Sequence, residues 1–118
     1  MRAFALCIFS FLSVTSFLHA QDFPNRTVRI VVPYAPSGNV DITARTMSQA
    51  FSDALGVQVV IDNRPGAGGG IGTTAVAKSP ADGYTLLLGS SGTITGGPAI
   101  YKNLAYDPIR DFVAIGAI

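Results

Sequence analysis

The chain has almost none of the residue types that carry acid–base, thiol or metal chemistry. It contains one Cys, one His, no Trp and no Glu, and both Cys7 and His19 lie within the first twenty residues. General acid–base catalysis and metal binding usually draw on His, Cys or Glu side chains. We therefore expect no catalytic residue, no metal and no cofactor beyond residue 20, and no disulfide framework to stabilise the fold.

A charge excess of either sign is also missing. Arg2 is the only basic residue of the first twenty, so the rest of the chain sets seven Lys and Arg against seven Asp. A nucleic-acid-binding domain normally carries a basic face, and this balance excludes such a partner.

The first twenty residues have the pattern of a signal peptide. Arg2 is followed by an apolar run over residues 3–12 and then by more polar residues up to Ala20. The run is too short for a membrane-spanning helix, which needs about 20 apolar residues. We expect cleavage after Ala20, export to the periplasm and a mature domain over residues 21–118.

Alternating hydrophobic patterns beyond residue 26 predict an α/β fold. β-Branched runs predict strands, whereas apolar residues at helical spacing that end at Gly56 predict a helix. Strands that alternate with helices favour a mostly parallel sheet with helices on both faces. The expected strands are 27–32, 57–61, 85–88 and 112–118, and the expected helices are 40–55 and 71–78, with a short helical turn at 99–103.

Three loops that are rich in small residues follow the expected strands. Ligands of open parallel sheets bind outside the carboxyl ends of the strands, and the amides that open the next helix form an anion site. These loops are Tyr34-Ala35-Pro36-Ser37-Gly38-Asn39, then Asn63-Arg64-Pro65 with Gly66 to Gly70, and then Gly89-Ser90-Ser91-Gly92-Thr93. A structural role is the alternative for each: glycines serve tight turns, Ser37 and Asn39 serve as helix caps, and Asp41 pairs with Arg45 four residues later.

Two enzymatic interpretations fail on residue spacing. A dinucleotide G-x-G-x-x-G motif would need Gly at Ile71 or Thr73, and a hydrolase G-x-S-x-G motif would need Gly at Thr93. No His remains beyond residue 20 to act as a base for a nucleophilic Ser, and although a Ser-Lys pair with Lys78 or Lys102 stays formally open, no spacing supports it. We therefore expect a binding protein and not an enzyme.

Several motifs in one order give the chain a family resemblance. They are Ile30 to Pro36, Asp41 with Arg45, Asn63 to Gly69, Asp82 to Gly89, Tyr101 to Leu104, Tyr106 to Pro108, and Asp111-Phe112. The chain resembles the receptors of tripartite tricarboxylate transporters, also called the Bug family. These two-lobed extracytoplasmic proteins deliver small organic anions to membrane transporter subunits.

The resemblance implies a type II periplasmic-binding-protein lobe and a ligand site. Backbone amides around residues 35–38 would bind a small di- or tricarboxylate or an acidic amino acid, Asp41 would help to define the ligand, and the other two loops would line the cleft. The implied ligand-binding residues are Tyr34, Ala35, Pro36, Ser37, Gly38, Asp41, Gly66, Ala67, Gly68, Gly69, Ser90, Ser91 and Thr93. Relatives usually have Gly where Ser37 stands.

Length is the main departure from the family, whose chains run to roughly three hundred residues, as expected for two domains. We expect residues 21–118 to be an incomplete N-terminal lobe without its second lobe, impaired in binding when alone, whereas the full-length form would be a monomer. The alternative is a stand-alone exported α/β interaction domain that needs a partner chain to complete its fold.

Overall fold

The computed structural model describes residues 22–118, and the expected signal peptide lies outside these residues. Three parallel strands form the sheet: β1 (Val28–Val32), β2 (Val59–Asn63) and β3 (Thr85–Leu87), in the order β2-β1-β3. Two helices connect them, α1 (Asn39–Leu55) and α2 (Gly70–Ala77), and a short helix α3 (Gly97–Ile100) follows β3. The predicted parallel α/β architecture is confirmed.

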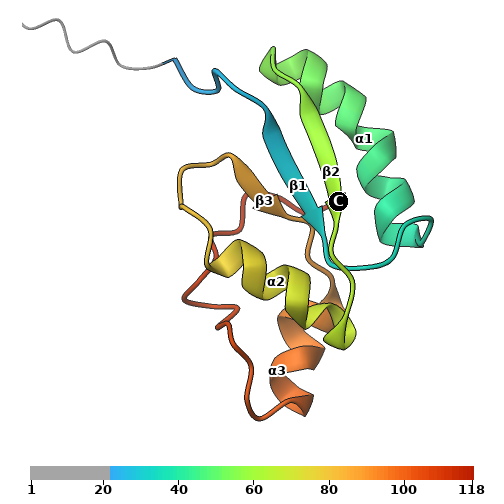
Figure 1. Ribbon diagram of the computed structural model, residues 1–118, viewed down its shortest axis with the longest axis vertical. Coiled ribbons are helices and arrows are strands. Elements are labelled where there is room, and N and C mark those ends of the chain that lie inside the picture. Colours follow the sequence, from blue (N-terminus) through green and yellow to red (C-terminus); the bar gives the residue numbers. More distant parts are fainter. Residues whose placement is uncertain (1–21) are drawn as a thin grey trace, which may run out of the picture.

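The helices pack on the sheet as Figure 1 shows, with α1 against β2 and β1, and α2 against β1 and β3. Because β2 and β3 lie on opposite sides of β1, right-handed crossovers place α1 and α2 on opposite faces. The central strand is accordingly the best buried, and Val28, Val31 and Val32 are each at most 2% exposed. The core is small and lies along this strand.

Helix α1 follows directly from its sequence. Gly56 caps the C-terminus of the helix after Leu55. Its left-handed conformation (φ 68°) lets the Gly56 amide donate a hydrogen bond to the Ser52 carbonyl. On its inner side the Ser52 hydroxyl accepts a hydrogen bond from the Val59 amide at 2.9 Å. This contact ties the end of α1 to the start of β2.

Two expectations at the C-terminal end of the chain are wrong. Residues 112–118 form no strand; no other strand of the described chain pairs with them, and Val113 is 88% exposed. β-Propensity without a pairing partner does not make a strand. The third small-residue loop is also partly helical, because a π-helical turn η2 (Gly92–Gly96) continues into α3.

Candidate functional site

The three strands end at one edge of the sheet, and their loops meet there. Val32 pairs with Asn63 in β2, and Val31 pairs with Leu87 in β3, so the carboxyl ends of all three strands are level. Parallel strands therefore bring the loops at 33–38, 64–69 and 88–91 together. This is the edge at which ligands of open α/β sheets bind.

The first loop leads into the N-terminus of α1 and borders a hollow. Gly38 is the N-cap residue, and no side chain caps the N-terminus of α1. The first backbone amides of a helix have no hydrogen-bond partner within the helix, and at α1 no capping side chain supplies one. The helix dipole adds positive potential at this end. The hollow has a volume of about 350 Å³ and is lined by Tyr34, Ala35, Gly38, Asn39, Val40 and Ser90.

A buried carboxylate lies just behind this loop. Asp41 is 2% exposed; its Oδ2 accepts hydrogen bonds from the Ser37 amide at 2.8 Å and from Arg45 Nε at 2.9 Å. Its Oδ1 accepts a third from Asn63 Nδ2 at 2.9 Å. Hydrogen bonds from Arg45, the Ser37 amide and Asn63, in part opposed by burial, lower the pKa of Asp41 to about 2. Asp41 is therefore ionised at neutral pH.

The second loop contributes mainly close packing. Gly69 has a left-handed φ of 93°, and a Cβ at this position would lie 2.6 Å from Thr93 Cγ2 and 3.4 Å from Tyr34 Cζ. Only Gly fits where the three loops touch. The short 3-10 turn η1 (Ala67–Gly69) begins after Gly66, whose φ of 123° also requires Gly.

The third loop is fastened to the first by side-chain hydroxyls. The Tyr34 and Ser90 hydroxyls are 2.5 Å apart, and Ser90 Oγ also accepts a hydrogen bond from the Gly92 amide at 3.1 Å. Thr93 is 1% exposed, and its carbonyl accepts a hydrogen bond from the buried Tyr106 hydroxyl at 2.7 Å. Burial and, second, the proximity of Tyr34 raise the pKa of Tyr106. Tyr106 thus stays protonated and anchors η2.

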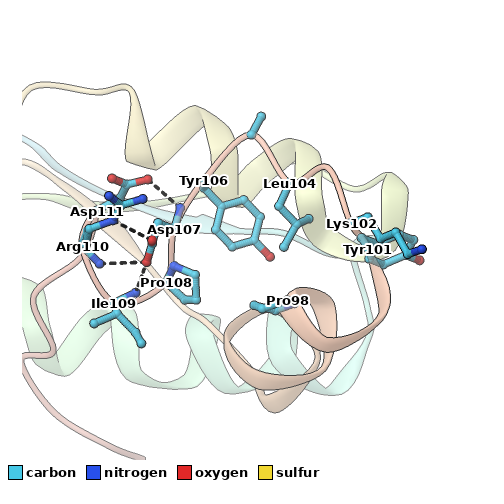
Figure 2. A pocket seen from close by; sticks show the side chains of 11 residues that line it. Pro98, Tyr101, Lys102, Leu104, Tyr106, Asp107, Pro108, Ile109, Arg110 and Asp111 are labelled. Atoms are coloured by element: carbon cyan, nitrogen blue, oxygen red, sulfur yellow. Dashed lines mark hydrogen bonds and ion pairs between the residues drawn. The ribbon is translucent and has the colours of Figure 1, made fainter.

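A larger, shallow hollow of about 650 Å³ is lined by residues of α3 and of the segment that follows it (Figure 2). Leu104, Tyr106 and Pro98 line its centre, and a turn of charged residues closes one end. In that turn Asp107 Oδ1 accepts from the Ile109 and Arg110 amides, Oδ2 accepts from Arg110 Nε at 2.7 Å, and Asp111 accepts from the Asp107 amide. These amides, with the Arg110 side chain, lower the pKa of Asp107.

The chemistry favours the smaller hollow as the ligand site. The charged groups of the turn from Asp107 to Asp111 satisfy one another, which is the pattern of a structural turn. The smaller hollow has an uncapped helix N-terminus and hydroxyl groups at its wall. Among the described residues no group of His, Cys, Asp or Glu side chains is arranged to hold a metal ion.

The structure separates the expected site residues into groups. Tyr34, Ala35, Gly38 and Ser90 line the hollow, whereas Asp41 and Thr93 are buried behind it and Gly69 joins the loops. The lining contains none of the remaining expected residues, Pro36, Ser37, Gly66, Ala67, Gly68 and Ser91.

Sequence reasoning missed Asn39 and Val40 as lining residues; their position in the first helical turn was the signal that could have identified them. It also missed Asn63 as a partner of Asp41, whereas the predicted pairing of Asp41 with Arg45 is present.

Comparison with known proteins decides the family. The family described as "Tripartite tricarboxylate transporter family receptor" matches residues 43–118. The chain belongs to this family. The expectation of a binding protein and not an enzyme is confirmed at this level, because the family is one of receptors.

Relatives and solved structures agree with this assignment. The chain is 42% identical over 100 residues to the protein BugT of Bordetella pertussis. This match covers 84% of the chain and 31% of BugT. Among solved structures it resembles the periplasmic binding protein BugD (TM-score 0.73, 44% identity), covering 76% of this chain and 30% of that one.

Two similar structures contain carboxylates. MatC from Rhodopseudomonas palustris has bound malate (TM-score 0.73, 42% identity, 76% of this chain and 31% of that one). Another protein, from R. palustris, is in complex with adipate (TM-score 0.71, 41% identity, 75% of this chain and 29% of that one). The chain spans about three tenths of the length of these relatives. The prediction of a periplasmic-binding-protein fold is confirmed.

Periplasmic binding proteins are thus the chain's structural relatives. None of the helices in residues 22–118 is both long and apolar enough to cross a membrane.

Proposed function

We propose that the chain forms part of a periplasmic receptor that binds a small dicarboxylate and delivers it to the membrane subunits of a tripartite tricarboxylate transporter. The observation that carries the proposal is the uncapped N-terminus of α1 beside a hollow at the carboxyl edge of the sheet. Family membership and the malate and adipate in similar structures support the choice of ligand class.

The geometry suggests how a carboxylate would be held. The amides of Asn39 and Val40 open α1, and one carboxylate group would accept hydrogen bonds from them inside the 350 Å³ hollow. The Tyr34 and Ser90 hydroxyls would border the same group. Charge-assisted hydrogen bonds of this kind are roughly twice as strong as neutral ones.

The same proposal assigns residues 21–118 to the N-terminal lobe of a two-lobed receptor. The similar structures are about three times as long as the matched part, and in such a protein the second lobe would supply the opposite wall. Closure of two lobes excludes water and strengthens the electrostatic interactions in the site.

A direct test compares the purified chain with a fusion of the chain to the remaining part of MatC. Thermal shift and titration calorimetry against malate, adipate, citrate, aspartate and neutral glycerol would measure binding. We expect carboxylates, but not glycerol, to raise the melting temperature of the fusion, by an amount that grows with ligand concentration. Absence of any carboxylate effect on both proteins would contradict the proposal.

A second candidate function rests on exposed apolar side chains near the C-terminal end of the chain. Ile109 and Val113 are 86% and 88% exposed, which suits an exported domain that pairs with another chain. Co-purification of the chain as a stoichiometric complex with one partner, together with no carboxylate binding, would favour this candidate.

A further inference from the structure

We infer that Asp41 is a positioning residue that fixes the first loop from behind and does not touch the solute, which refines the expected role of Asp41 in defining the ligand. This inference rests on the proposed function only for the identity of the solute. Its starting point is that both carboxylate oxygens of Asp41 are already occupied by groups of the protein.

Asp41, Arg45 and Asn63 form a closed ring of hydrogen bonds. Arg45 Nε and Asn63 Nδ2 both donate to Asp41, and Arg45 Nη2 donates to Asn63 Oδ1 at 2.9 Å. The ring joins the first turn of α1 to the last residue of β2. Its members therefore hold one another in single orientations, and Asp41 is 2% exposed.

The ring is attached to the first loop at two points. The Ser37 amide donates to Asp41 Oδ2 at 2.8 Å, and Asn63 Nδ2 donates to the Tyr34 carbonyl at 3.2 Å. The backbone from Tyr34 to Ser37 is thus held at both ends, and Tyr34 and Ala35 line the hollow. Ser37 has a left-handed φ of 69°, which a non-Gly residue adopts only when its surroundings hold it there.

The ring also compensates the negative charge of Asp41 behind the hollow. An unpaired carboxylate at the start of α1 would repel an anionic solute, but the guanidinium of Arg45 lies 2.9 Å from Asp41 and compensates its charge. The α1 N-terminus therefore keeps a positive potential toward the hollow. Loss of Arg45 would leave a buried negative charge there.

Solute selectivity distinguishes positioning from direct contact. If Asp41 touched the solute, Asp41→Asn would change the order of affinities, because a carboxylate that recognises an ammonium group would favour aspartate over malate. If Asp41 positions the loop, Asp41→Asn weakens malate, adipate and aspartate by the same factor, which we expect to be about tenfold because a charge-assisted hydrogen bond to Ser37 is lost.

The experiment uses the purified chain and its fusion to the remaining part of MatC, each as wild type, Asp41→Asn, Arg45→Gln and the double variant. Arg45→Gln alone should weaken all three anions more than Asp41→Asn does, and the double variant should recover toward the Asp41→Asn value, because it removes the unpaired charge. Val76→Ala is the control, since it destabilises the core at a residue outside the ring.

A binding-independent measurement keeps this inference separate from the proposed function. Amide hydrogen exchange at Ser37 should speed up in Asp41→Asn but not in Val76→Ala, measured well below both melting temperatures. If no carboxylate binds the wild type, the proposed function fails while Ser37 exchange still tests the positioning role. Unchanged exchange at Ser37, or a changed order of solute affinities in Asp41→Asn, would overturn the inference.

Discussion

At the scale of single residues, the first loop contains one strained backbone position, which a hydrogen bond from its amide to a neighbouring side chain holds in place. Ser37 has a positive φ, and its amide is held by the buried carboxylate of Asp41. A left-handed conformation costs a residue with a Cβ about 1 kcal/mol, whereas Gly adopts it freely. Ser37 therefore places a residue with a Cβ at a backbone position that suits Gly.

Ser37→Gly is expected to stabilise the fold by up to about 0.5 kcal/mol, because relief of about 1 kcal/mol of strain is partly offset by the extra entropy of Gly in the unfolded chain, about 0.4 to 1 kcal/mol. Urea denaturation followed by circular dichroism measures the change. Ser37→Ala is the matched control, since it keeps both the Cβ and the amide bonded to Asp41, and it should leave stability nearly unchanged. A lower stability of Ser37→Gly than of Ser37→Ala would contradict the assignment of strain.

The lowered pKa of Asp41 predicts how the stability of the fold depends on pH in the acid range. Its pKa is lowered to about 2, first by Arg45 and then by the Ser37 amide and Asn63, from an ordinary value of 3.8. A carboxyl with a lowered folded-state pKa stabilises the fold fully above its unfolded pKa, and this stabilisation is lost as the pH falls through the folded pKa. The stability difference between wild type and Asp41→Asn should therefore be constant above pH about 5 and shrink between pH about 4 and 2.

Denaturation at a series of pH values measures this difference, with Asp53→Asn as the control at a carboxyl on the exposed side of α1. A difference that stays constant from neutral pH down to pH about 2 would show that folding does not lower the pKa of Asp41, and one that grows as the pH falls would show that folding raises it.

At the scale of elements, the approach of α2 to the sheet depends on a glycine. A Cβ at Gly72 would lie 2.7 Å from the Arg64 carbonyl oxygen and 2.9 Å from Pro33 Cα, and both neighbours are backbone atoms that do not move easily. At Gly70, two residues earlier in the same helix, the nearest atom is Ala67 Cβ at an ordinary 3.7 Å. The two glycines of one helix therefore have different roles.

Gly72→Ala is expected to destabilise the fold by about 1 to 3 kcal/mol, because the helix must shift away from the ends of β1 and β2. Gly70→Ala is the control in the same helix and should be neutral or stabilising by up to about 1 kcal/mol, since Ala is the better helix former. Thermal denaturation of both variants measures the contrast. Equal effects of the two substitutions would mean that α2 does not pack as closely as described.

The same scale shows what the sequence could predict. Periodicity and Gly56 located α1 to within one residue, and the predicted parallel order of the strands correctly placed the three loops at one edge of the sheet. The strand expected over 112–118 failed because strand formation depends on a partner, which local sequence does not reveal. The link from Asn63 to Asp41 was also hidden, because it joins residues that only the sheet register brings together.

At the scale of the whole molecule, the described chain leaves much of its apolar surface open. Buried apolar residues cluster along β1, whereas Ile100, Ile109 and Ile115 are each more than 70% exposed. Contiguous exposed apolar surface promotes association between molecules. These exposed side chains are therefore available for contacts with other molecules.

The chain by itself is therefore expected to self-associate as its concentration rises, which sedimentation velocity measures. Replacing Val113 and Ile115 by Ser should reduce association, because these side chains are 88% and 79% exposed. It should change the free energy of unfolding by no more than about 0.5 kcal/mol, since neither side chain packs in the core. Lys102→Ser is the polar control and should leave association unchanged. A wild type that stays monomeric at high concentration would show that this surface is not adhesive, and the interaction-domain alternative would then lose its main support.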